Sequence, residues 1–154
     1  MQPSTEPTAP QQPRRLTDRE THALAAIFQQ FPSIQAVYLF GSYAQGRPRA
    51  DSDIDLAIVP RRGVEPPDKL DALTELARAG FDNVDLVILD VYNLATADLV
   101  LTYEAVRLNR LIYQTDDFER GTVYSKVVRH YLDFKPYLDV QREAYKRRIL
   151  HGQG

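Results

Sequence analysis

Apolar residues along most of the chain repeat at either helical or strand spacing, and glycine or proline separates the runs. Thr17 and Glu20 form a capping-box pattern, and apolar residues three and four apart follow, which predicts a helix over about 17–31 ended by Pro32. The other predicted elements are a strand Ile34–Phe40, a short helix Ser42–Gln45, a strand Asp53–Val59, a helix from Pro66 to Gly80, a strand Val84–Leu89, a helix over 94–107 capped by Asn93, and a strand Arg110–Tyr113.

This order of elements predicts a small α/β (α+β) domain over residues 16–115. Two strands that follow each other so closely near its start favour a small mixed sheet flanked by helices. Residues 1–15 contain four of the ten prolines and almost no large apolar side chain, so we expect a disordered tail. Residues 116–154 have helical composition and predict a C-terminal helical extension, kinked at Pro136 because proline removes a helical hydrogen bond.

Composition narrows the chemistry that such a domain can perform. The 154 residues suit one domain, and the absence of cysteine excludes a disulfide scaffold, a thiol nucleophile and a cysteine-based zinc site. Only three histidines are present, so catalysis would depend on carboxylates, hydroxyls or backbone groups. The net charge of −2 predicts no direct nucleic-acid binding. No apolar run is long enough for a membrane helix and no signal-peptide pattern is present, so we expect a cytoplasmic protein.

Asp53 and Asp55 lie two residues apart in a predicted strand, so their side chains point to the same face of the sheet. Adjacent carboxylates repel each other, and a cation relieves the repulsion. Mg²⁺ is usually held by one or two carboxylates, with substrate phosphates and water completing its coordination. On its own the pattern also fits an exposed face of an edge strand.

Gly41 and Ser42 stand at the junction between a predicted strand and a predicted short helix. Backbone N–H groups at such a junction bind anions, the serine hydroxyl adds a donor, and glycine lets a phosphate approach the backbone. Gly-Ser is also a common turn. Followed by ten residues and then Asp-Ile-Asp, it predicts a phosphate-binding turn facing a metal-binding pair.

A third carboxylate, Asp85, interrupts the apolar run Val84–Leu89. It either faces solvent at the start of that strand or joins Asp53 and Asp55 on one face, if the two strands are neighbours. In the second case it would serve as a metal ligand or take the proton of an acceptor hydroxyl.

The run GSYAQGRPRADSDIDLAIV resembles the Gly-Ser, ten residues, Asp-x-Asp signature of nucleotidyltransferases in the DNA polymerase β-like superfamily, and its spacing matches without a gap. The resemblance covers roughly residues 20–115. The chain is most similar to the minimal nucleotidyltransferases, the MntA-type antitoxins that act beside a helical HEPN-domain RNase toxin of the HepT type. This implies transfer of AMP from ATP to a toxin tyrosine by a two-metal mechanism, which would block the toxin's RNase site.

The resemblance also implies a role for each matching residue. Gly41 and Ser42 would contact the triphosphate of ATP, and Asp53 and Asp55 would hold two Mg²⁺ ions. Asp85 would complete the metal site and help to activate the acceptor. Tyr43 would pack near the nucleotide or merely cover the turn.

One position departs from the family pattern. Gln45 stands where members commonly carry arginine. Arg47 or Arg49 would replace its phosphate contact, or would remain solvated loop arginines.

About 40 residues follow the predicted core, which suits a helical arm better than a second domain that encloses an acceptor. A HEPN-domain partner in a hetero-oligomeric complex is therefore the simpler acceptor. Residues 129–150 carry six basic and three acidic residues, a pattern of a docking helix or of a solvated helix face. Two alternatives remain: a non-catalytic antitoxin that binds by occlusion, and a nucleotidyltransferase for a small molecule such as an aminoglycoside.

Overall fold

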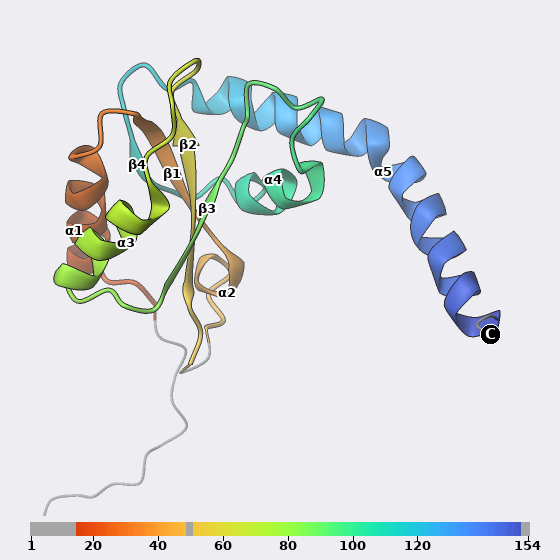
Figure 1. The fold of residues 1–154 in the computed structure, drawn as a ribbon, viewed down its shortest axis with the longest axis horizontal. Helices are drawn as coiled ribbons and strands as arrows, with labels where there is room; N and C mark the ends of the chain where they lie inside the picture. The colour runs from red at the N-terminus through yellow and green to blue at the C-terminus, as the bar shows by residue number, and fades with distance from the viewer. Residues whose placement is uncertain (1–14, 49–50, 152–154) are drawn as a thin grey trace, which may run out of the picture.

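The described part of the chain, residues 15–48 and 51–151 of a computed structural model, forms a four-stranded sheet with helices on both faces (Figure 1). Residues 1–14 of the predicted tail lie outside the described residues. The elements in chain order are α1 Asp18–Gln29, β1 Ile34–Phe40, α2 Gly41–Ala44, β2 Ile54–Pro60, α3 Lys69–Arg78, β3 Val84–Ile88, α4 Leu99–Val106, β4 Leu111–Gln114 and α5 Arg120–His151.

The sheet has the strand order β3-β2-β1-β4 and is mixed, as the sequence predicted. β1 pairs antiparallel with both β2 and β4, whereas β2 and β3 run parallel. The parallel pair is joined through α3, because parallel neighbours need a crossover connection. β2 and β3 therefore begin at the same end of the sheet, where β1 finishes.

Two apolar clusters cover the two faces of the sheet. Alternate residues of β2 divide between them, because successive side chains of a strand point to opposite faces. Ile54, Leu56 and Ile58 pack with α1 and α3, while Ala57 and Val59 pack on the side of α4 and α5. Figure 1 shows α1 and α3 on one side of the sheet and α4 on the other.

The predicted helices are present, but the residues at which some of them begin differ from the prediction. The capping box of α1 is present, with reciprocal hydrogen bonds of 3.0 Å between Thr17 and Glu20. The prediction that Asn93 caps a helix over 94–107 was wrong: α4 begins five residues later, where the Asp98 carboxylate accepts a hydrogen bond from the N–H of Leu101. Similarly, Asp68 caps α3, which begins at Lys69, so the two prolines expected in its first turn precede the helix.

α5 is a single helix of 32 residues that contains Pro136. Figure 1 shows that its first half lies along the domain, and that it bends before its second half projects away. A bend is the expected result of a proline inside a helix. Among the described helices, α5 included, none is both long and apolar enough to cross a membrane.

Candidate active site

Strand register brings Asp55 and Asp85 together at one end of the sheet. Asp55 pairs with Phe40 of antiparallel β1 and with Asp85 of parallel β3. Asp53 immediately precedes β2 and lies two residues before Asp55. Ala57 and Val87 lie two residues beyond Asp55 and Asp85 in the same strands, so their side chains point to the same face, and they pack in the cluster beside α4 and α5. The three carboxylates therefore belong to that face, as the Asp-x-Asp spacing predicted for the first two.

Gly41 approaches the Asp55 carboxylate so closely that no other residue fits its place. Its φ is +72°, which L side chains rarely adopt. A Cβ built on it would lie 2.0 Å from Asp55 Oδ2, so the carboxylate fills the space of a side chain. The Gly-Ser turn and the Asp-x-Asp pair, separated by ten residues in sequence, are thus in direct contact.

The turn itself is a short helix, α2, fixed by hydrogen bonds at its end. The N–H of Gln45 donates to Gly41 O at 3.1 Å, and the N–H of Arg47 donates to Ser42 O at 2.9 Å. Arg110 immediately precedes β4, and its guanidinium donates to Ala44 O at 2.9 Å. Sequence reasoning missed Arg110, because 66 residues separate it from Ala44 and no local pattern signals the contact.

The electrostatics of the site favour a cation. Partial burial raises the pKa of Asp55 above its ordinary range, and the charges of Asp85 and Asp53 raise it further. A divalent ion would offset this repulsion, and carboxylate oxygens are the ligands that Mg²⁺ prefers. Within the described ranges, no three Asp, Glu or His side chains come close enough to hold an ion by themselves. The paired carboxylates of Asp55 and Asp85 are a donor set of the kind that holds Mg²⁺ together with substrate phosphates.

The other predicted contacts are less well supported. Gln45 and Arg47 are exposed at the end of the turn, and Arg49 lies outside the described residues. Tyr43 is buried on the α1 and α3 side of the sheet, opposite the acids. It covers the turn, which was one of the two roles considered for it.

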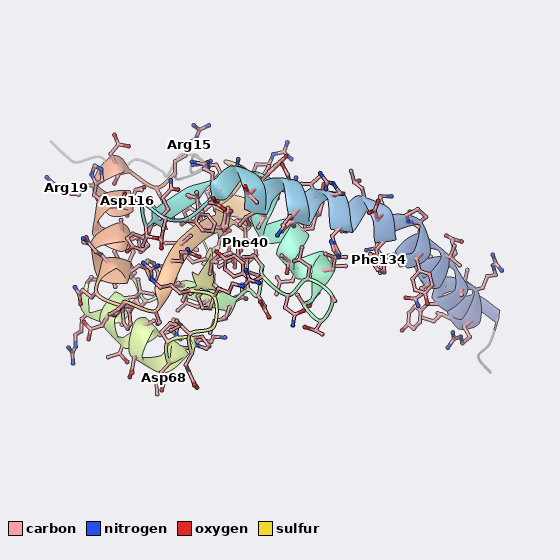
Figure 2. All side chains as sticks on the ribbon, turned by 90° about the horizontal axis from the view of Figure 1, so that it is seen from above. Arg15, Arg19, Phe40, Asp68, Asp116 and Phe134 are labelled. Atoms are coloured by element: carbon pink, nitrogen blue, oxygen red, sulfur yellow. The ribbon has the colours of Figure 1, made fainter. Side chains whose placement is uncertain are left out.

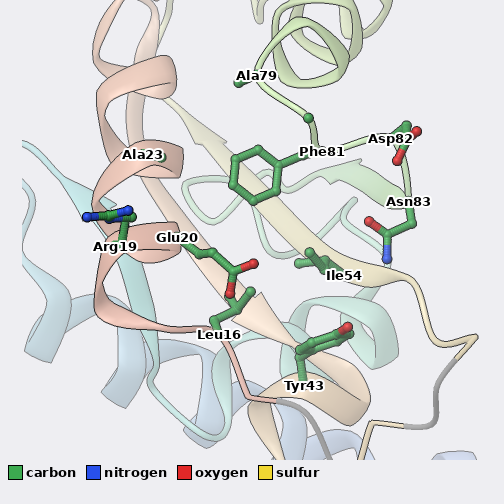
Figure 3. Close-up of a pocket in the computed structure, with 11 residues that line it drawn as sticks. Leu16, Arg19, Glu20, Ala23, Tyr43, Ile54, Ala79, Phe81, Asp82 and Asn83 are labelled. Carbon is green, nitrogen blue, oxygen red and sulfur yellow. The ribbon is translucent and has the colours of Figure 1, made fainter. Parts of the chain in front are cut away.

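A cavity of about 490 Å³ lies on that opposite side, between α1 and the loop after α3. Figure 3 shows Tyr43, Ile54, Glu20 and Phe81 around it. Ile54 stands between Asp53 and Asp55 in sequence, so its side chain points away from theirs. This cavity is therefore behind the carboxylates and does not belong to their site.

Comparisons with known proteins show which family and fold the chain is similar to. A sequence profile described as polymerase β, nucleotidyltransferase matches residues 22–118. The protein adenylyltransferase MntA of Shewanella oneidensis is 30% identical over 96 residues, which are 62% of this chain and 66% of that protein, just under two thirds of its length.

Solved structures show the same fold. A chain from a toxin–antitoxin crystallised with AMP-PNP is 25% identical, with a TM-score of 0.61 over 84% of this chain and 98% of that one. A chain from the complex of tri-AMPylated Shewanella oneidensis HEPN toxin with its MNT antitoxin is 23% identical, with a TM-score of 0.56 over 84% and 95%. The latter likeness concerns the fold alone.

Proposed function

Because the chain belongs to the polymerase β nucleotidyltransferase family, we propose that it transfers AMP from ATP to a tyrosine hydroxyl of a HEPN-type toxin and thereby neutralises it. One observation carries the proposal: Asp55 contacts the Gly41 turn on one side and pairs with Asp85 on the other. The turn that would bind the phosphates thus lies against the paired carboxylates. The adenylyltransferase MntA and the toxin–antitoxin bound to AMP-PNP support the choice of nucleotide and partner.

In this proposal the triphosphate of ATP lies against the turn. The backbone of Gly41 and the hydroxyl of Ser42 contact its oxygens, since glycine allows close approach and the start of a short helix offers free N–H groups. Arg47 or Arg49 would supply the phosphate contact of the arginine that Gln45 replaces.

Asp53 and Asp55 would hold two Mg²⁺ ions together with the phosphates, and Asp85 would complete the set. When bound, the ions lower the pKa of the attacking hydroxyl and stabilise the charge of the leaving pyrophosphate. The raised pKa of Asp55 indicates that its charge is unfavourable without a cation, which is the property expected of such a ligand.

The chemical step is an in-line displacement. The tyrosine oxygen attacks the α-phosphorus of ATP, and a new P–O bond forms while the bond to the β-phosphate oxygen breaks. The proton of the tyrosine passes to the carboxylate of Asp85, which is exposed beside Asp55. Pyrophosphate leaves, and the tyrosine keeps the AMP. Most of the rate enhancement comes from positioning and charge stabilisation, as in phosphoryl transfer generally.

The test is the intact mass of a purified HEPN-type toxin after incubation with this chain, ATP and Mg²⁺. We expect a mass increase equal to one or more AMP units, lost on adding a chelator and lost in Asp53→Asn. Asp53 is exposed, so this substitution leaves the fold unchanged. Asp82→Asn removes the same charge from an exposed loop position nearby and should retain transfer.

An unmodified toxin that nevertheless stays bound and inhibited would contradict the proposal and identify an antitoxin that acts by binding alone. Transfer to an aminoglycoside without any protein acceptor would contradict the choice of substrate.

A further inference from the structure

The side of α5 that packs against α4 continues into the second half of the helix, which lies beyond the domain. In the first half, Val123 and Val127 are buried in the cluster that contains α4. The ring of Tyr131 stacks on Tyr103 of α4, with centroids 3.8 Å apart and planes at 4°. This stripe of α5 is therefore an ordinary helix-packing face up to Tyr131.

The same stripe continues after Tyr131 at spacings of three and four residues. Its members are Phe134, Leu138, Gln141, Tyr145 and Ile149, which we call the arm stripe. Spacings of three and four residues keep these side chains on one side of the helix, both before and after the bend at Pro136, as on a face that packs against a neighbouring helix. Yet Phe134, Tyr145 and Ile149 are 49, 60 and 58% exposed. Figure 2 shows Phe134 on the part of α5 that lies beyond the sheet.

The arm stripe borders a groove rather than a flat surface. A hollow of about 300 Å³ is lined by Val100 of α4 together with Leu138, Gln141 and Tyr145, and Arg142 and Lys146 form its basic edge. α4 and α5 cover the face of the sheet that carries Asp53, Asp55 and Asp85. A protein that docks in this groove is therefore on the same side of the sheet as the proposed active site.

Charge indicates what kind of occupant fits. Residues 134–150 carry five basic and two acidic residues, and one acid, Asp139, is already paired with Lys135 at 2.9 Å. A second copy of the arm would bring the same basic flank against it, which is unfavourable. Other exposed apolar side chains, Leu132, Tyr137, Val140 and Leu150, are spread around the helix, so the arm, over its described residues, lacks the single broad apolar face of a membrane-surface helix. A helix with an apolar seam and acidic flanks is complementary in both shape and charge.

We propose that the arm stripe and Val100 form the docking surface for the acceptor protein, which they bind through an acidic-flanked helix of that partner. The identity of the partner rests on the proposed function, since the acceptor is the HEPN-type toxin. Docking on the arm would hold the acceptor tyrosine near the carboxylates while AMP is transferred.

The experiment measures calorimetrically the affinity of the full chain for purified HEPN-type toxin, without ATP, so that binding is separated from transfer. The double variant Phe134→Ala, Tyr145→Ala removes two exposed aromatic anchors, and we expect an affinity loss of about tenfold or more. Leu132→Ala, Val140→Ala is the matched control. These residues are 55 and 68% exposed but lie off the stripe, so affinity should stay within about twofold of wild type.

Charge gives a second, independent readout. Arg142→Glu, Lys146→Glu should weaken binding and reduce its dependence on salt, because it reverses the basic edge of the groove.

Equal losses in the stripe and control variants, or no loss in either, would overturn the docking proposal. Stripe-dependent binding to phosphatidylserine vesicles but not to the toxin would do the same, as would a homodimer that dissociates in the stripe variant. Failure of the proposed function has a different outcome from failure of the docking proposal. If the toxin binds through the arm stripe but receives no AMP, the docking proposal holds and the proposed function is wrong. If the stripe variant binds and modifies the toxin with wild-type affinity and rate, the proposed function holds and the docking proposal is wrong.

Discussion

Replacing Gly41 with alanine tests the contact on which the candidate site depends. The new Cβ would lie 2.0 Å from Asp55 Oδ2, whereas real Cβ contacts stay beyond 3.0 Å. The carboxylate must therefore move by about 1 Å or rotate away. A displacement of about 1 Å in a catalytic constellation can lower the rate about 100-fold. We expect a loss of this size in AMP transfer at saturating ATP and toxin.

Backbone strain is separated from the clash by a matched control. Gly63 has a φ of +73°, nearly the +72° of Gly41, but a Cβ there meets nothing within 4 Å. Gly63→Ala should cost about 1–2 kcal/mol in the free energy of unfolding, and Gly41→Ala at least as much, since both positions occupy the left-handed region and only Gly41 adds a clash. Urea denaturation measures this cost, and only Gly41→Ala should also lose activity. Transfer by Gly41→Ala within about twofold of Gly63→Ala would refute the reasoning.

Three further predictions concern the acids, the turn and the first helix. The pKa of Asp55 is raised, so the folded chain binds that proton more tightly than the unfolded chain, and the charged carboxylate lowers stability at neutral pH. Asp55→Asn should therefore raise the Tm at pH 7 and abolish transfer. The gain in Tm should shrink as the pH falls toward about 4, and an unchanged Tm at pH 7 would contradict the prediction. Arg110→Met removes the hydrogen bond to Ala44 O, so we expect steady-state kinetics to show a KM for ATP raised several-fold, with kcat less affected. Arg110→Lys should restore the KM. Thr17→Ala removes the capping box of α1 and should cost about 1 kcal/mol in unfolding free energy without changing transfer.

Local signals in the sequence were sufficient for most of the elements. β1 occupies the predicted Ile34–Phe40, because an apolar run ended by glycine is a signal complete within a few residues. The start of α4 was wrong because Asn93 and Asp98 are both good caps, and the sequence alone does not say which one the packing uses. The segment after Asn93 instead forms turns.

In the candidate site, too, some features follow from local sequence and others from tertiary structure. The sequence by itself determined the residue types and their spacing: Gly-Ser at the end of one strand, and Asp53 and Asp55 on one face of the next. Only the tertiary structure decided that β3 lies parallel to β2 in a register that sets Asp85 beside Asp55, and that Gly41 touches the carboxylate of Asp55. Spacing along a strand follows from local backbone geometry, whereas register and contact depend on how distant segments bury their apolar faces together.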